Sequence, residues 1–305
     1  MQVADWWWIP ITLAAALAQT VRNAAQRSLT KDLGTLGATL VRFLYGLPFA
    51  LAWLYVVVAF TGRAIPVPTL PFLGWTLLGA LGQIAGTALL LRTMQERNFT
   101  LGVAYSKTEV LQIALFGFVI LGDRVSVAGL CAVVAGTVGV LLMSPPDKER
   151  PLRALVAGWT SRSGLLGLAS GTGFAFAAIG YRGSTLANPE AGFLVAAAFA
   201  LVVAQSMQTL ILGGWMAARE IASVVRVFQA WRRSLLAGFM GAAASAGWFT
   251  AFAIEPAAHV RTLAMVELLF AYAVSLKLFR ERFSALELWG IAFIAAGVIL
   301  ITLLH

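Results

Sequence analysis

Long apolar segments alternate with short polar breaks along the whole chain. Each apolar run is continuous and close to about 20 residues long, which is the length that a helix needs to cross a hydrocarbon core. Membrane barrel strands would instead read as alternating runs of about ten residues. The pattern therefore predicts an all-α integral membrane protein. We expect ten transmembrane helices at about residues 7–27, 36–60, 70–92, 99–121, 125–143, 164–182, 190–213, 233–254, 258–279 and 284–303.

The ten predicted helices divide into two halves of similar sequence. A constant offset of 158 residues places Glu109 on Glu267 and Arg124 on Arg282 without a gap. Charged matches carry more weight than apolar ones, because any two membrane helices share apolar residues by chance. Five helices cross the membrane an odd number of times, so the second half enters with the opposite orientation. This predicts two inverted five-helix repeats, an architecture of many secondary transporters. The expected boundaries are 7–143 for the first repeat, 144–162 for a charged loop, and 163–303 for the second repeat.

The residues around the two matched glutamates resemble the ten-helix EamA-type proteins of the drug/metabolite transporter superfamily. The first half reads Ala104-Tyr-Ser-Lys-Thr-Glu-Val-Leu, followed by Leu-Gly-Asp-Arg-Val-Ser. The second half reads Leu263-Ala-Met-Val-Glu-Leu-Leu, followed by Phe-Arg-Glu-Arg-Phe-Ser. The sequence departs from the family pattern because no proline follows either glutamate, and Asp123 stands where the second half has Glu281. The resemblance implies export of amino acids and related metabolites, or exchange of phosphorylated compounds and nucleotide sugars.

Composition narrows the class of protein further. Hydrophobic residues make up 60% of the chain and charged residues 11%, which excludes an ordinary soluble protein. The net charge of +9 comes from Arg and Lys at segment ends, so we interpret these residues as membrane anchors and expect no nucleic-acid partner. Cys131 is the only cysteine, and His259 and His305 are the only histidines. We therefore expect no metal site and no cofactor, with proton coupling left open.

Glu109 and Glu267 are the sharpest candidates for a functional site. An ionisable group at the centre of a membrane helix costs about 2.5 to 3.5 kcal/mol on insertion scales, so a residue of this kind is a candidate for a functional role. The residues that share the helical face of Glu109 are Gly102, Tyr105, Ser106 and Gln112. The functional interpretation makes the two carboxylates ligands for a substrate amine or carriers of protons. The alternative is that each one pairs with a neighbouring Arg or Lys as a link between helices.

Several cations also lie deep inside predicted helices. Arg22 shares a face with Gln19 and Asn23, Arg42 lies in the second helix, and Lys107 lies in the fourth. Arginine offers a bidentate fork to a carboxylate or phosphate, and lysine offers a point charge, so these residues suit an anionic substrate. The alternative is internal neutralisation. Lys107 is two residues from Glu109, and we expect the two side chains to point to different faces of the helix.

A few further residues complete the candidate set. Gln83 and Trp248 are weaker candidates for substrate contact, Arg261 lies near the start of the ninth helix, and Arg27 is near enough to a helix end to reach the interface. Gly82 and Gly86, like Gly167 and Gly171, have the spacing that lets helices approach closely.

The sequence predicts a secondary transporter of a small charged metabolite that works by alternating access, and not an enzyme. No nucleotide-binding loop is present in the sequence. Two rivals stay open: a lipid or isoprenoid flippase, and an integral membrane enzyme acting on lipid. The Arg-rich, Ala-rich composition favours a bacterial inner membrane. The positive-inside rule places 144–162 and 214–232 in the cytoplasm, whereas the family resemblance places both termini there.

Overall fold

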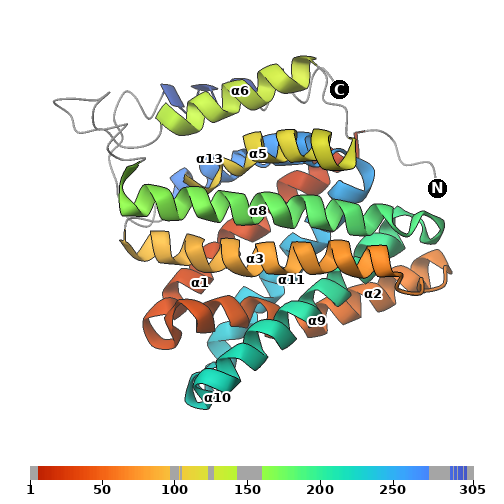
Figure 1. Ribbon diagram of the computed structural model, residues 1–305, viewed down its shortest axis with the longest axis vertical. Coiled ribbons are helices and arrows are strands. Elements are labelled where there is room, and N and C mark those ends of the chain that lie inside the picture. Colours follow the sequence, from red (N-terminus) through yellow and green to blue (C-terminus); the bar gives the residue numbers. More distant parts are fainter. Residues whose placement is uncertain are drawn as a thin grey trace. The chain divides into compact units, whose positions relative to one another are not determined.

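The computed structural model describes residues 6–96, 103, 105–122, 127–142 and 160–274, together with 289–300 except for 291, 294 and 298. The regular elements in this part of the chain are helices, and no strand occurs in it (Figure 1). The all-α prediction is confirmed for these residues. Most of the charged loop expected at 144–162 lies outside the described residues, as do Gly102, Asp123, Arg124, Glu281 and Arg282.

Five stretches among the described residues are long and apolar enough to cross a membrane, which is compatible with a multi-pass integral membrane protein. They are Trp8–Thr61, Leu70–Glu96, Arg162–Leu186, Phe193–Arg219 and Trp231–Ile254. The first covers 54 residues. One straight helix of that length would measure about 80 Å, which is far more than a bilayer needs, so this stretch has room for two crossings. Shorter apolar helices occur at Glu109–Leu121 and Gly129–Gly139.

The chain forms two compact units, which are described separately. Unit 1 consists of Met1–Ile84 and Phe176–Glu255, and unit 2 consists of Ala85–Ala175 and Pro256–His305. Each unit therefore combines segments from both predicted repeats. The helices α3 (Leu70–Glu96) and α8 (Arg162–Leu186) each contribute residues to both units.

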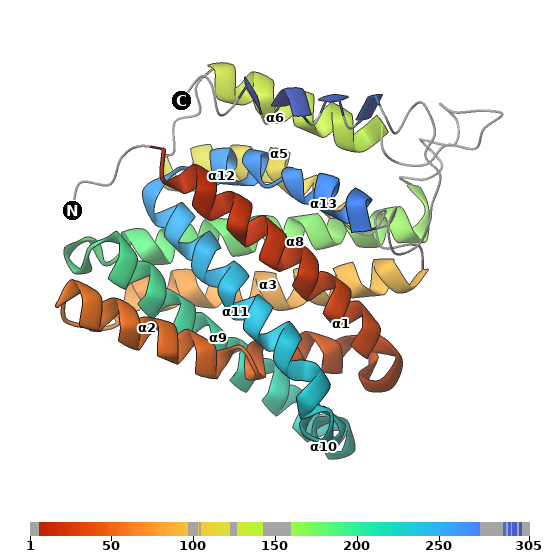
Figure 2. The ribbon, with the colours of Figure 1, turned by 180° about the vertical axis from the view of Figure 1, so that it is seen from behind.

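Unit 1 is built around a turned first helix. Its other elements are α2 (Leu47–Thr61), parts of α3 and α8, the short η2 (Pro189–Ala191), α9 (Phe193–Arg219), α10 (Ile221–Gln229) and α11 (Trp231–Ile254). Within α1 (Trp8–Leu44), Gly34 has φ 68° and ψ 176°, a conformation that glycine adopts without a steric penalty. The chain reverses there, inside the break predicted between residues 27 and 36. The part of α1 that precedes Gly34 lies side by side with α11 (Figure 2), and Ala15 contacts Gly247 there.

The region after the seventh predicted helix differs from the expectation. Residues 214–232 were expected to form a connecting loop, but α9 runs to Arg219 and α10 follows it almost at once. Helix α10 has only nine residues and is apolar on one side alone. A search for continuous apolar runs therefore passes over it, whereas a search for helical periodicity would find it.

Unit 2 contains two interrupted helices. Its elements are parts of α3 and α8, α5 (Glu109–Phe116), the wider turn η1 (Gly117–Leu121), α6 (Val127–Leu142), α12 (Ala257–Leu263), α13 (Val266–Val274) and short helical pieces within 289–300. The sequence predicts single helices at 99–121 and 258–279. The structure instead breaks the first at Lys107 and Thr108 and the second at Ala264 and Met265.

Small residues hold the helices of unit 2 close together, as their spacing predicts. Gly86 of α3 lies against the ring of Phe174 in α8, and Gly167 of α8 lies against Tyr105. A methyl group added to Gly171 would come within 2.9 Å of the Ser106 carbonyl oxygen. The α8 backbone therefore passes directly beside the break at residues 107–108.

Candidate functional site

The two helix breaks in unit 2 have the same local geometry. The Val110 amide donates a hydrogen bond to the Lys107 carbonyl at 3.2 Å, and the Leu268 amide donates one to the Met265 carbonyl at 2.9 Å. Each bond spans three residues, where an α-helical bond spans four, so the backbone is tightened at both places. The two bonds are also separated by the same offset of 158 residues that aligns the glutamates. As a result, Glu109 and Glu267 both lie in the first turn of a helix that starts after a break.

Four charged side chains meet at these breaks inside unit 2. Lys107 Nζ lies 2.5 Å from Glu267 Oε2 and 3.8 Å from Glu109 Oε1. Arg261 Nη1 lies 3.4 Å from the same oxygen of Glu109. All four residues are at most 4% exposed, and their two positive and two negative charges cancel. We call Lys107, Glu109, Arg261 and Glu267 the charge cluster.

The pairing within the charge cluster is reciprocal. The cation from the segment before Glu109 pairs with Glu267, and the cation from the segment before Glu267 pairs with Glu109. Helix α12, which carries Arg261, packs on α5, which begins with Glu109. Each pair therefore joins one predicted repeat to the other.

The structure corrects one expectation about this cluster. Lys107 and Glu109 were predicted to point to different faces of one helix, but Nζ and Oε1 are 3.8 Å apart. The prediction assumed an uninterrupted helix, and the turn at residues 107–108 removes that assumption. Of the two interpretations of the glutamates, the pairing with neighbouring cations is present in the structure.

One oxygen of the charge cluster has no donor. Glu109 Oε2 is buried and accepts no hydrogen bond from the part of the chain that the structure describes. A buried polar atom without a partner is rare and costs about 1 to 3 kcal/mol, and more when it is charged. Because Oε1 already faces both Lys107 and Arg261, Oε2 is the oxygen of Glu109 that is open to a proton.

Close packing surrounds the charge cluster. A methyl group at Gly171 would lie 3.2 Å from the Glu109 backbone nitrogen, and Met265 packs against Gly136 of α6. Tyr105 and Ser106 are buried beside it, whereas Gln112 is only half-buried. Such packing limits the access of water, so the electrostatic interactions among the four charges are stronger than they would be at a surface.

A second group of predicted residues comes together in unit 1. Arg22 donates a hydrogen bond from Nη2 to Asn23 Oδ1 at 2.6 Å, and Arg42 donates one from Nη2 to Ser245 Oγ at 3.4 Å. Both arginines pass over Gly241 of α11, where an added methyl group would lie 3.0 Å from Arg42 Cγ and 3.5 Å from Arg22 Cδ. We call Arg22, Asn23, Arg42 and Ser245 the arginine cluster.

Neutral hydrogen bonds extend this region of unit 1. Trp248 donates from Nε1 to Gln19 Oε1 at 2.9 Å. Gln26 donates from Nε2 to the Ala38 carbonyl at 2.7 Å, which links the two limbs of α1 across the Gly34 turn. Gln83 is buried in the same unit.

Two contributors were missed by sequence reasoning. Ser245 lies in a run of small residues that carries no signal for a side-chain partner. Arg182 was expected at a helix end, but it is buried and donates from Nη1 to the carbonyl oxygens of Phe252 and Glu255 at 2.7 and 2.8 Å. This places a positive charge at the carboxyl end of α11, where the helix dipole favours it.

The two units differ in their balance of buried charge. Among the described residues, unit 1 buries three arginines, Arg22, Arg42 and Arg182, against one acid, Glu255. Unit 2 buries two cations against two glutamates. Among the buried side chains that the structure describes, unit 1 therefore has two more positive than negative charges, and unit 2 has equal numbers of each. No group of three or more His, Cys, Asp or Glu residues that could hold a metal ion occurs in the described part of the chain.

Comparisons with known proteins identify the fold but not the function. No family model matches the chain, and no match was found among curated proteins. A solved structure, described only as a crystal structure of a protein, matches 97% of this chain and 96% of its own with a TM-score of 0.67. The two sequences are 16% identical. At this level of identity the similarity shows a common fold alone.

Proposed function

We propose that the protein is a secondary active transporter of a small charged metabolite, with ten membrane crossings arranged as two inverted repeats at 7–143 and 163–303. The observation that carries this proposal is the reciprocal pairing at two equivalent helix breaks. Interrupted membrane helices from repeat-related positions commonly form the ion and substrate sites of secondary transporters. Buried ionisable groups in membrane helices commonly belong to proton or substrate pathways. A bacterial inner membrane is the proposed location.

The charge cluster would serve as the coupling site. A proton that binds Glu109 Oε2 removes one negative charge, so the balanced cluster becomes positive and the attraction between Glu109 and Arg261 is lost. Lys107 and Arg261 then face a single remaining carboxylate, that of Glu267. Loss of the proton restores the pair between Glu109 and Arg261. Protonation would therefore control how strongly the segment 103–122 is held to the segment 257–274, and alternating access needs such a control.

The buried arginines of unit 1 support an anionic substrate as part of this proposal. Arg22 and Arg42 would hold a carboxylate or phosphate group, because a guanidinium matches the geometry of both anions. Asn23, Gln19 and Trp248 would add neutral hydrogen bonds that select among anions. An amino acid or a related compound with a carboxylate satisfies this description.

The proposal can be tested by solute-induced thermal stabilisation of the purified protein. Amino acids, phosphorylated sugars, nucleotides and polyamines would be compared, and a ligand at about 100 times its Kd stabilises the folded state by about 2.7 kcal/mol. We expect an anionic or zwitterionic solute to stabilise the wild type, and Arg22→Met and Arg42→Met each to abolish that effect. If polyamines alone stabilise the protein, the anionic assignment is wrong.

Variants of the charge cluster test the coupling. In Glu109→Gln and Glu267→Gln we expect the stabilisation by the solute to lose its dependence on pH. Glu96→Gln is the matched control, because Glu96 also belongs to unit 2 but forms ion pairs with the exposed residues Arg92 and Arg162. An unchanged pH dependence in both cluster variants would remove the charge cluster from the coupling mechanism.

A further inference from the structure

Helix α10 presents three different faces, although it has only nine residues. Val227 is fully buried in unit 1, where it lies against Gly37 and its carbonyl accepts a hydrogen bond from the Tyr45 hydroxyl at 3.1 Å. Ile221, Val225 and Phe228 lie on a second face and are 62%, 46% and 55% exposed. The remaining face is polar and carries Arg226 and Gln229. The helix is therefore anchored to its own unit on one side and presents an uncovered apolar face beside a polar one.

The position of α10 restricts what can cover this apolar face. It connects the end of α9 to the start of α11, and both of those helices are candidate membrane spans (Figures 1 and 2). Leu210 on α9 and Leu236 on α11 are exposed large apolar side chains that would face lipid. The exposed apolar side chains of α10 thus lie in the chain between two candidate spans that also expose large apolar side chains.

An arginine and a tryptophan flank α10 at each end. The Arg219 guanidinium lies 5.5 Å from the ring centre of Trp215, and that of Arg232 lies 5.3 Å from the ring centre of Trp231. Neither arginine forms an ion pair with a carboxylate in the part of the chain that the structure describes, whereas Arg226 pairs with Glu220 and Arg233 pairs with Asp32. Tryptophan is enriched at the level of lipid headgroups. The two arginines are thus exposed cations beside interfacial aromatic rings.

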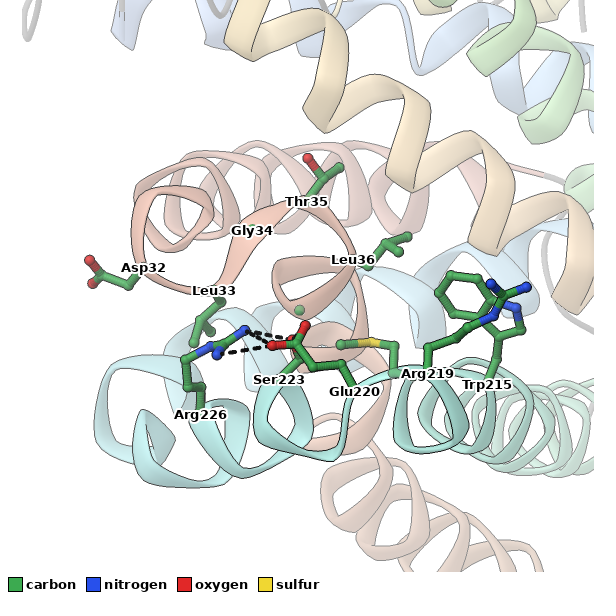
Figure 3. A pocket seen from close by; sticks show the side chains of 12 residues that line it. Asp32, Leu33, Gly34, Thr35, Leu36, Trp215, Arg219, Glu220, Ser223 and Arg226 are labelled. Carbon is green, nitrogen blue, oxygen red and sulfur yellow. Dashed lines mark hydrogen bonds and ion pairs between the residues drawn. The ribbon is translucent and has the colours of Figure 1, made fainter.

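A cavity opens beside the amino end of α10, within unit 1 (Figure 3). It has a volume of about 630 Å³ and is lined by the Gly34 turn, the end of α9 and the first turns of α10. Leu36 and Met216 supply apolar walls, and the polar ones come from Arg219, Ser223, Arg226, Asp32 and Glu220. Because Glu220 pairs with Arg226, Arg219 is the cation of the lining that has no carboxylate partner among the described residues. Its volume lies in the range of cavities that hold small ligands.

We propose that α10 lies in the plane of the bilayer interface and binds anionic phospholipid through Arg219 and Arg232, with a headgroup held in the cavity beside Arg219. The inference rests on the proposed membrane insertion and goes beyond the transport function. An amphipathic helix with arginine and tryptophan at its borders buries its apolar face at the boundary between headgroups and acyl chains. Anionic lipids are concentrated in the cytoplasmic leaflet, so this assignment agrees with the cytoplasmic location that the charge bias predicts for 214–232.

Fluorescent labels at single cysteines test the depth of α10. Cys131→Ala supplies the background, and Val225→Cys, Phe228→Cys, Gln229→Cys and Leu210→Cys are labelled in nanodiscs. We expect a lipid-borne nitroxide to quench the labels at 225 and 228, and aqueous iodide to quench the label at 229. The label at 210, on a candidate span, should respond to the nitroxide alone.

The label at residue 210 separates the two proposals. If iodide quenches the labels at 225 and 228 as strongly as the label at 229 while 210 stays protected, α10 is in water and this inference is wrong, but membrane insertion stands. If 210 is also open to iodide, the proposed insertion fails. Labels at 225 and 228 that neither quencher reaches, together with cross-linking between copies at 225, would show that a second copy of the chain covers this face.

Lipid selectivity is measured with spin-labelled phosphatidylglycerol and spin-labelled phosphatidylcholine. Each arginine near an anionic surface is expected to favour the anionic lipid about fivefold. The preference at the label on residue 225 should therefore fall by more than tenfold, to near unity, in the double variant Arg219→Gln and Arg232→Gln. Arg233→Gln, which removes a cation already paired with Asp32, should retain it. Equal selectivity in all three proteins would overturn the lipid assignment.

Discussion

Units 1 and 2 both bury charged side chains, but they balance them in different ways. In unit 2, Lys107 and Arg261 each lie within 4 Å of a glutamate carboxylate. In unit 1, Arg22 and Arg42 contact neutral oxygens of Asn23 and Ser245, and buried positive charge exceeds buried negative charge. Burial of a cation in a membrane helix is costly in either case.

The charge cluster and the arginine cluster should respond differently to a proton and to an anion. A balanced set of charges responds strongly when one proton is added, because one attraction disappears while the like charges stay. An arginine side chain keeps its positive charge at ordinary pH, so the arginine cluster can attract an anion. This contrast is the basis on which we propose coupling for the charge cluster and anion recognition for the arginine cluster.

The largest effect on stability is expected from removal of one partner in the charge cluster. Glu267→Ala leaves the Lys107 ammonium buried without the carboxylate that lies 2.5 Å away, and such a change costs about 3 to 5 kcal/mol. Denaturant unfolding of the purified protein measures it. The double variant Lys107→Met and Glu267→Leu should regain most of the loss, since it buries no unpaired charge. A loss below about 1 kcal/mol in the single variant would show that water reaches the cluster.

The next largest loss of stability is expected where α8 packs against the helix break beside the charge cluster. In Gly171→Ala the new methyl group would lie 2.7 Å from Thr108 Oγ1 and 2.9 Å from the Ser106 carbonyl, so we expect a loss of about 1 to 3 kcal/mol. Gly213→Ala in α9 is the matched control. Its methyl group would meet Leu40 at 3.6 Å, an ordinary contact, so it should be neutral or slightly stabilising. Equal losses in both variants would contradict the tight approach of α8 to the break.

Loss of a neutral hydrogen bond in unit 1 should lower the free energy of unfolding less than loss of a charged partner in unit 2. Gln26→Leu removes the bond to the Ala38 carbonyl and is expected to cost about 0.5 to 1.5 kcal/mol. Because this bond joins the two limbs of α1, hydrogen exchange near Gly34 should also become faster. A loss as large as that of Glu267→Ala would remove the contrast between the two units.

The smallest change in stability is expected at the surface. Arg233 and Asp32 approach to 2.8 Å, but their side chains are 67% and 49% exposed. Solvent and salt screen such pairs, so Arg233→Gln should cost less than about 1 kcal/mol. The difference should vanish in high salt. A larger loss that persists in high salt would indicate a structural role for this pair.

The Glu220 carboxyl at the start of α10 has a pKa that is shifted in a known direction, so its effect on stability at different pH values can be predicted. A hydrogen bond from the Ser223 hydroxyl, together with the charge of Arg226, lowers the pKa of Glu220 below its usual value. The contribution of this contact to folding is therefore complete above the unfolded pKa and is lost as the pH falls through the folded pKa. Ser223→Ala should move the Glu220 pKa upward in a carbon-13 NMR titration. An unchanged value would show that the hydrogen bond is absent in solution.

The sequence predicts the all-α class and the five long apolar stretches, because continuous apolar runs of this length are read directly from the sequence. It also singles out Glu109 and Glu267 by their matched positions. It does not predict the approach of Lys107 to Glu109, because neither glycine nor proline marks the break at residues 107–108. The contact of Arg261 with Glu109 joins residues 152 positions apart and depends on how α12 packs on α5, which no local pattern specifies.

The most direct test of the central claim, that Glu109 exchanges a proton within the charge cluster, is infrared difference spectroscopy of the protein in lipid as the pH is changed. In the wild type we expect the carbonyl stretch of a protonated carboxyl group to gain intensity as the pH falls. Glu109→Gln should lose that component, and Glu96→Gln should retain it. If the spectra of the wild type and Glu109→Gln coincide throughout the pH range, Glu109 takes up no proton and the charge cluster is a structural link between helices.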